Sequence, residues 1–142
     1  MSSQLNVDTI VDKAGSGGTN IKVANNAVAV AEGGSATTAV VQGLAKAWAK
    51  SSGDGSPSLT NSFNVASLTD NDTGDQTFTY TSSMSNANSS STGSPVDDDQ
   101  AVTMQHLGVD TTALTRFHSH TDDTGGAADS DGKHIVVHGD LA

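Results

Sequence analysis

The sequence of 142 residues contains no cysteine, two prolines, one tryptophan and one tyrosine, and aromatic residues make up only 4% of it. The absence of cysteine excludes disulfide bonds and thiolate-bound metal ions. Because apolar residues reach only 34%, a fold built from this chain can bury one modest core and hardly two. We therefore expect one domain whose thin core gains stability by sharing apolar surface with further copies of the chain.

Basic residues are scarce as well. Six lysines and arginines stand against 16 acidic residues, which gives a net charge of −10. The six are spread along the sequence, whereas phosphate binding needs clustered basic side chains. We expect no nucleic-acid partner.

Long apolar runs are missing too. No stretch approaches the roughly 20 apolar residues that span a bilayer, and the polar start MSSQLNVDT has neither the basic nor the apolar part of a secretion signal. We expect no membrane partner, and a protein that is made in the cytoplasm and stays soluble until it is assembled.

Motifs of catalysis are also lacking. The sequence has no GxSxG motif. Glu32 is its single glutamate, so a pair of catalytic carboxylates for glycoside hydrolysis would have to come from aspartates that lie close together in the sequence. The glycine runs at 15–18 and 33–34 lack the lysine and the spacing of a phosphate-binding loop. We expect a protein that is not an enzyme.

The chain is rich in serine, threonine, asparagine, glycine and alanine, and alternating threonines among turn-forming residues favour β-structure. The predicted fold class is mainly β. A single antiparallel β-sandwich or jelly-roll-like body covers residues 19–142, after an extended N-terminal arm and glycine-rich hinge at 1–18. The body is predicted to be an oligomer, with a trimer favoured.

The N-terminal arm is predicted from alternating residues between Gln4 and Ile10, which end in the flexible AGSGG at 14–18. A terminal strand of this kind can add to the sheet edge of a neighbouring protein. The residues predicted to dock the arm are Leu5, Val7, Thr9 and Ile10.

Strands are predicted along the body. Residues 19–31 predict a hairpin or kinked strand around an Asn-Asn pair, and 37–49 predict one strand with its alanines on one face. Residues 59–81 predict a hairpin with the turn TDNDTGD, and the serine-rich tract 82–99 predicts a long surface loop. Further strands are predicted near 102–106 or 114–120, and at 134–137.

Apolar and aromatic residues of these strands are predicted to pack in the core or between subunits, namely Leu44, Trp48, Phe63, Val65, Phe78 and Tyr80. Trp48, with Lys46 and Lys50 beside it, admits two interpretations. It is either a surface anchor for a partner or the central packing residue, and the second is favoured for a lone tryptophan.

The sequence FHSHTDD places His118 and His120 on one side of a strand, followed by Asp122 and Asp123, in a pattern that suits a divalent metal ion. A site shared by three subunits on a symmetry axis is the form this would take. No complete calcium-loop pattern is present, and ordinary solvated polar residues are the favoured interpretation. We expect no cofactor apart from this candidate metal.

Five short motifs, four between residues 42 and 88 and one at the end of the chain, resemble segments of a known class of proteins. They are GLAKAW, SFNVAS, LTDNDTGD, QTFTYTSSM and the final IVVHGDLA. In this order they resemble segments of small β-rich structural proteins from tailed phages of marine bacteria, which occur alone and within longer tail-fibre chains. The resemblance implies an oligomeric component of the virion, made in the host cytoplasm.

Two places on the virion fit the resemblance. The favoured one is a capsid decoration or cement protein that binds and stabilises the shell of major capsid protein. The alternative is a tail or head fibre component whose arm enters a connector and which attaches the particle to the host. A short chain without a repetitive shaft favours decoration, and an enzyme acting on surface glycans is a remote alternative.

Overall fold

The computed structural model describes residues 43–53, 55–98, 101–108 and 110–140, together with the backbone of two short strands at 28–30 and 37–39. The chain forms two compact units, Met1–Val41 and Gln42–Ala142. The docking residues predicted for the N-terminal arm lie outside the described residues, as does the Asn-Asn pair of the predicted hairpin; they are Leu5, Val7, Thr9, Ile10, Asn25 and Asn26.

In the first unit, β1 (Val28–Val30) pairs with β2 (Thr37–Ala39) as an antiparallel hairpin. Within the described ranges these two strands pair only with each other. The body is predicted to begin at residue 19; the compact unit that holds the two larger sheets begins at Gln42.

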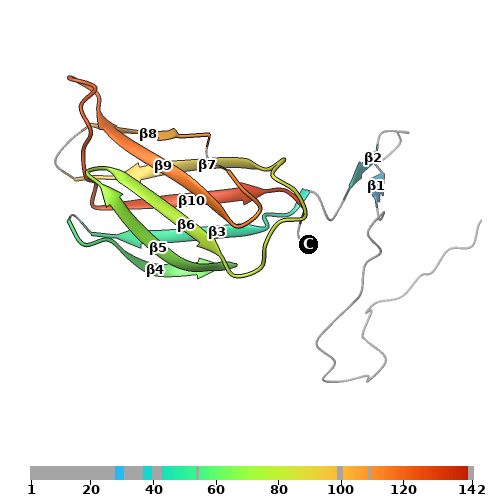
Figure 1. The fold of residues 1–142 in the computed structure, drawn as a ribbon. Coiled ribbons are helices and arrows are strands. Elements are labelled where there is room, and N and C mark those ends of the chain that lie inside the picture. Colours follow the sequence, from blue (N-terminus) through green and yellow to red (C-terminus); the bar gives the residue numbers. More distant parts are fainter. Residues whose placement is uncertain are drawn as a thin grey trace, which may run out of the picture. The chain divides into compact units, whose positions relative to one another are not determined.

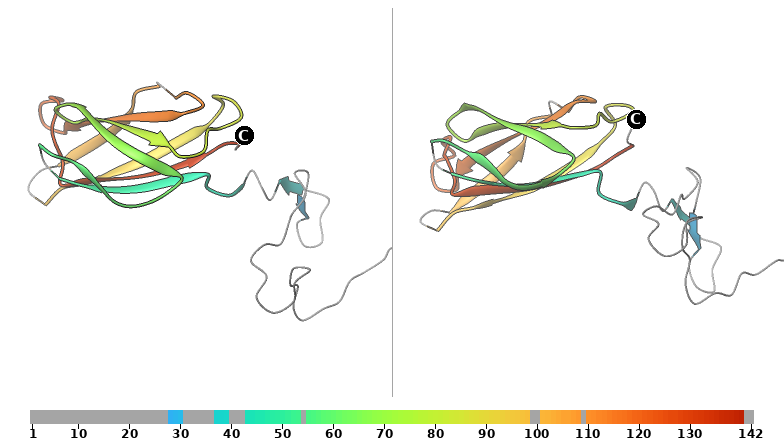
Figure 2. Two further views of the ribbon diagram at one scale, coloured as in Figure 1. Left: turned by 60° about the horizontal axis from the view of Figure 1, so that its bottom comes forward. Right: turned by 90° about the horizontal axis from the view of Figure 1, so that it is seen from below.

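The second unit contains eight strands in two antiparallel sheets (Figure 1). Sheet I has the order β4-β3-β10-β7, and sheet II has the order β5-β6-β9-β8. The strands are β3 (Ala47–Ser52), β4 (Ser58–Phe63), β5 (Val65–Asp72), β6 (Asp75–Tyr80), β7 (Ser90–Val96), β8 (Val102–His106), β9 (Leu114–Thr121) and β10 (Gly132–His138). The sheets lie face to face as two layers (Figure 2), which confirms the mainly β, sandwich-like class.

The chain passes from sheet I to sheet II at Asn64. This residue has φ 56°, a left-handed conformation that asparagine tolerates better than most residues. Its amide nitrogen donates to the carbonyl oxygens of Lys46 at 3.1 Å and Ser82 at 3.0 Å, and its amide oxygen accepts from Ser82 N at 2.7 Å. The single strand predicted for 59–68 is therefore two strands in different sheets.

The hairpin of β5 and β6 turns at Thr73 and Gly74, as its Asx-rich sequence predicts. Gly74 has φ +72°, and a Cβ on it would lie 2.5 Å from the carbonyl oxygen of Ser119 and 2.6 Å from that of Ala128. Only glycine fits this close approach of three backbone segments.

Two predictions of secondary structure are wrong. The single strand expected at 37–49 is interrupted, because β2 ends at Ala39 and β3 starts at Ala47. The long loop expected at 82–99 contains β7, whose backbone pairs with β10 along seven residues. As an edge strand, β7 tolerates Pro95. Its sequence SSTGSPV has no alternation of apolar and polar residues from which a strand could be predicted.

The core lies between the sheets and is small. Phe78 of β6 packs edge to face on Phe117 of β9, with ring centroids 6.4 Å apart. Its other buried members are Ala47, Ala49, Val65, Tyr80, Met84, Ile135 and Val137. Opposite Ile135, Gly93 of β7 leaves room for Met104, because a Cβ at Gly93 would lie 1.8 Å from the Met104 methyl carbon. Small residues on sheet I thus make space for larger ones on sheet II.

Three charged side chains are buried among the described residues, Lys46, Asp75 and Lys133, and of these Lys133 is fully enclosed. Lys133 of β10 is 0% exposed, and its Nζ has no hydrogen-bond partner. Burial lowers the pKa of Lys133, while the charges of nearby aspartates act in the opposite direction. The lysine backbone is well held, since Ser51 Oγ accepts from Lys133 N at 3.1 Å and donates to Lys133 O at 3.4 Å.

Replacing Lys133 by methionine is expected to raise the free energy of unfolding by about 1–3 kcal/mol, because it removes a buried ammonium group that lacks a partner. Urea unfolding at neutral pH measures the change. Lys50→Met, at an exposed position of the same sheet, is the control and should stay within about 0.5 kcal/mol of the wild type. Loss of stability in Lys133→Met relative to that control would contradict the prediction.

The pH dependence provides a second readout for the same variant. A lysine with a lowered folded-state pKa binds fewer protons when folded, so stability rises with pH until pH passes the ordinary value of 10.5. The wild type should show this rise and Lys133→Met should not. Measurements stay below pH 10, because burial raises the pKa of Tyr80 to about 12 and its contribution to stability is lost as pH rises above 10.

Candidate functional sites

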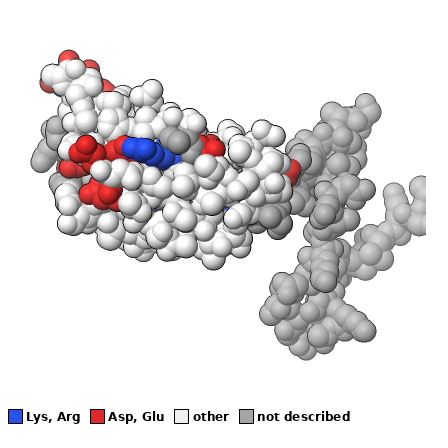
Figure 3. All heavy atoms as spheres, in the orientation of Figure 1, with Lys and Arg blue, Asp and Glu red and all other residues white. Residues whose placement is uncertain are grey.

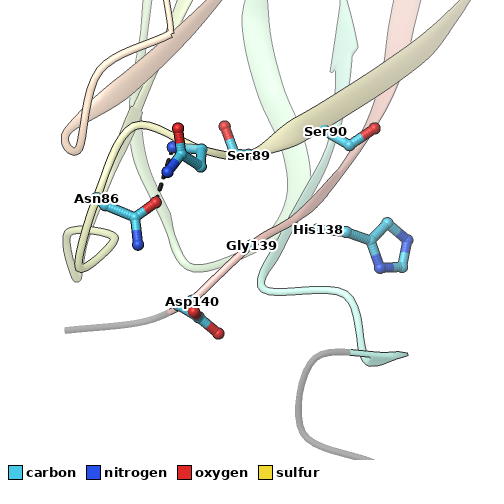
Figure 4. A pocket seen from close by; sticks show the side chains of 7 residues that line it. Asn86, Ser89, Ser90, His138, Gly139 and Asp140 are labelled. Atoms are coloured by element: carbon cyan, nitrogen blue, oxygen red, sulfur yellow. Dashed lines mark hydrogen bonds between the residues drawn. The ribbon is translucent and has the colours of Figure 1, made fainter. Parts of the chain in front are cut away.

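A shallow polar depression of about 580 Å³ lies at one end of the sandwich, between the segment before β7 and the end of β10 (Figure 4). It is lined by Asn86, Asn88, Ser89, Ser90, His138, Gly139 and Asp140. Serine, histidine and aspartate therefore meet here. Yet Ser89 Oγ donates to Asp110 at 3.2 Å rather than to His138.

The outer face of sheet I carries an exposed apolar row. Trp48 of β3 lies opposite Phe63 of β4 on one side and Val136 of β10 on the other. Trp48 is 36% exposed and Phe63 is 49% exposed. We call Phe63, Trp48 and Val136 the apolar row. Large exposed side chains in adjacent register positions are typical of surfaces that bind a partner.

A polar row runs beside the apolar row on the same face. Lys50 of β3 lies opposite Asn61 of β4 and His134 of β10, and His134 lies opposite Ser94 of β7. All four side chains are exposed. The polar row therefore offers hydrogen-bond donors and a positive charge in a chain that is acidic overall.

The six residues predicted to pack in the core or between subunits divide into two groups. Val65, Phe78 and Tyr80 are buried in the core, whereas Leu44 is 60% exposed and Trp48 and Phe63 lie on the outer face of sheet I. Trp48 is therefore not the central packing residue that its rarity favoured. Its neighbours Ala47 and Ala49 point inward, and the period of two along a strand turns Trp48 outward.

The outer face of sheet II is polar and contains an ion pair. Arg116 of β9 holds Asp75 of β6 with two hydrogen bonds, one from Nε to Oδ1 at 2.7 Å and one from Nη2 to Oδ2. Asn71 of β5 adds a donor to Asp75 Oδ1 at 3.2 Å. In Figure 3 one small basic patch is bordered by acidic atoms.

Asp75 is nearly buried, and its ionisation depends on Arg116. The hydrogen bonds from Arg116 lower the pKa of Asp75 from its ordinary value of 3.8, with help from Asn71 and against the effect of burial. The same pair raises the pKa of Arg116. Both groups are charged at neutral pH, and the pair clamps β6 to β9 across the face of the sheet.

His118 and His120 lie next to this ion pair on β9. They are on the same side of the strand, as predicted, with His118 Nδ1 and His120 Nε2 2.8 Å apart and the ring planes perpendicular. His118 lies opposite Asp75 in the register of β6 and β9. The aspartates that follow in sequence do not complete a metal site, since the described residues include no group of three or more histidines, aspartates or glutamates placed to hold one.

Comparison of this chain with protein-family models, with curated proteins and with solved structures gave no match. Functional inference therefore depends on the geometry of these surfaces. Among the described residues, no helix is long and apolar enough to cross a membrane.

Sequence reasoning missed the ion pair and the polar row. A signal for the first was present, because Arg116 is the only arginine and alternates with the buried Thr115 and Phe117, which places it on the outer face with His118. Its partner Asp75 is 41 residues away, and only the pairing of β6 with β9 brings the two together.

Replacing Asp75 by asparagine is expected to lower the stability of the sandwich at neutral pH, because Arg116 loses its charged partner. Since the folded-state pKa of Asp75 is lowered, its contribution is present above pH 3.8 and is lost as pH falls through the folded-state value. The difference between wild type and variant should therefore shrink in acid. Denaturant midpoints measured across this pH range test the prediction.

Asp123→Asn is the control, because Asp123 lies exposed in the turn after β9. It should leave the denaturant midpoint close to that of the wild type at every pH. An Asp75→Asn variant with the same pH profile as this control would show that the ion pair does not stabilise the fold.

Proposed function

We propose that this protein is a structural subunit of a tailed-phage virion, and that it acts as a capsid decoration or cement protein whose sandwich associates with neighbouring copies through the apolar row. The observation that carries the proposal is the exposure of Trp48 and Phe63 in adjacent register positions on the outer face of sheet I. The resemblance of the motifs between residues 42 and 88 to phage structural proteins supports the virion as the setting.

Association through this face has a clear driving force. Burial of apolar surface contributes about 25 cal/mol per Å² removed from water, and tryptophan is enriched among the residues that dominate binding energy. The core of one sandwich is small, so contact with a neighbour would increase the apolar surface area that each subunit buries. A trimer would let three such faces meet around one axis.

Attachment to the shell is assigned to the N-terminal arm. Addition of a strand from one subunit to the sheet edge of the major capsid protein joins them through main-chain hydrogen bonds. Many weakly bound copies then reinforce the shell together. In this function the protein acts by adhesion, and its described surfaces are used for contact.

A fibre component that attaches the particle to its host is the second candidate, and the polar row favours it. Trp48 and Phe63 offer flat apolar surfaces on which a sugar ring can stack. Lys50, Asn61 and His134 lie beside them with groups that hydrogen-bond hydroxyls. Either candidate uses the same face of sheet I, and the two differ in the number of copies on the particle.

The double variant Trp48→Ser/Phe63→Ser is expected to weaken self-association of the full-length protein at least about ten-fold, which corresponds to about 1.4 kcal/mol. Sedimentation equilibrium over a range of protein concentrations measures the dissociation constants. The folded structure should be retained, because both side chains are substantially exposed.

Leu107→Ser is the matched control, since Leu107 is a similarly exposed apolar residue (37%) that follows β8 of the other sheet. It should associate like the wild type. Equal dissociation constants for the double variant and this control would remove the apolar row from the interface, and a wild type that stays monomeric would exclude self-association altogether.

The copy number on purified particles is expected to be comparable with that of the major capsid protein, because a decoration protein follows the symmetry of the shell. Quantitative mass spectrometry against the major capsid protein measures this ratio. A handful of copies per particle would instead establish the fibre candidate, and absence of the chain from particles would overturn both.

A further inference from the structure

The histidine pair of β9 differs from ordinary exposed histidines because all of its ring nitrogens have close neighbours. His118 Nε2 lies 3.2 Å from the carbonyl oxygen of Thr73, in the β5–β6 turn. His120 Nδ1 lies 3.3 Å from the carbonyl oxygen of Gly125, in the turn after β9. The two remaining nitrogens, His118 Nδ1 and His120 Nε2, face each other at 2.8 Å.

The hydrogen bonds of these rings determine which ring nitrogens carry a hydrogen. A carbonyl oxygen only accepts hydrogen bonds, so His118 Nε2 and His120 Nδ1 must each carry a hydrogen. In a neutral imidazole this is the only hydrogen on the ring nitrogens. The two inner nitrogens then both carry a lone pair, and a positive charge beside them offsets the repulsion between these lone pairs. A metal ion bound by both inner nitrogens supplies this positive charge.

We infer that the pair formed by His118 and His120 is a binding site for a divalent transition-metal ion, in which His118 Nδ1 and His120 Nε2 are adjacent ligands of the same ion. The inference is separate from the proposed assembly function, because it concerns the outer face of sheet II and no residue of the apolar row.

The distance between the inner nitrogens fits this role. Two nitrogens bound at about 2.0–2.1 Å to one ion lie about 2.9 Å apart at a right angle and about 3.4 Å apart at the tetrahedral angle. The observed 2.8 Å matches the right angle. Square-planar or tetragonal coordination favours Cu²⁺ and Ni²⁺ over Zn²⁺, and Cu²⁺ binds nitrogen ligands most tightly of the three.

The surroundings of the pair also fit a metal ion. Histidine ligands usually donate their second N–H to a carboxylate or a backbone carbonyl, which fixes the tautomer and the ring orientation. Thr73 O and Gly125 O occupy these positions here. The positive charge of Arg116 on the same strand is paired with Asp75, so the neighbouring cation is already compensated. The remaining coordination positions are left to water, as in open metal sites.

Titration calorimetry with Cu²⁺ on the full-length protein tests the inference. We expect the single variants His118→Gln and His120→Gln each to weaken Cu²⁺ binding at least about ten-fold. Electron paramagnetic resonance should show two imidazole nitrogens on Cu²⁺ in the wild type and one in each single variant. Zn²⁺ is expected to bind more weakly than Cu²⁺.

The control is His134→Gln/His138→Gln, which removes two exposed histidines of β10 that are four residues apart and do not face each other. It should bind Cu²⁺ like the wild type. The inference is overturned if His118→Gln and His120→Gln bind Cu²⁺ as tightly as this control, or if the wild type shows no Cu²⁺ binding.

Thermal unfolding keeps the test independent of folding defects. A ligand that binds only the folded chain raises the unfolding temperature, so Cu²⁺ should stabilise the wild type and the β10 control but not the β9 variants. Unfolding of the metal-free variants at the wild-type temperature would show that they fold normally. Equal Cu²⁺ stabilisation of all these proteins would also overturn the inference.

Discussion

The edge-to-face packing of Phe78 on Phe117 is the contact on which the sandwich depends. These are the two largest fully buried side chains of the described residues, and they come from neighbouring strands of sheet II. Sheet I faces them with Ala47, Ala49, Ile135 and Val137. Side chains alternate between the two faces of a strand, so Trp48 points outward when its neighbours Ala47 and Ala49 on β3 point inward. A register slip by one residue would bury Trp48 and expose the alanines, and the interior has no room for that exchange.

The small space between the sheets also determines which apolar side chains lie on the surface of the molecule. Aromatic residues are few, so placing Trp48 and Phe63 outside the core costs the isolated sandwich apolar burial. Such a distribution is favourable when a partner covers the same side chains in an assembly. The interior also contains Lys133, whose buried ammonium group has no hydrogen-bond partner. The sandwich is thus stabilised by the backbone hydrogen bonds of its two sheets and by a few aromatic contacts.

The two outer faces differ in chemistry because different residue types alternate along their strands. Sheet I alternates alanine and valine with tryptophan, lysine and histidine, whereas sheet II alternates aromatic residues with threonine, arginine and histidine. The first face therefore offers apolar surface and the second offers charged and hydrogen-bonding groups. On β9 the spacing of two residues brings the imidazoles of His118 and His120 into contact, and turns from β5–β6 and after β9 fix their outer nitrogens.

Features that depend on local sequence patterns could be predicted before the structure was known. Alternation identified strands around Phe78, the Asx-rich turn identified the hairpin of β5 and β6, and the spacing of His118 and His120 placed both on one side of β9. Tertiary structure alone decided which face of β3 points inward, that Asn64 moves the chain between sheets, that β7 pairs with β10 and that Arg116 meets Asp75. A period of two defines two faces of a strand, but only packing against distant strands determines which of them is buried.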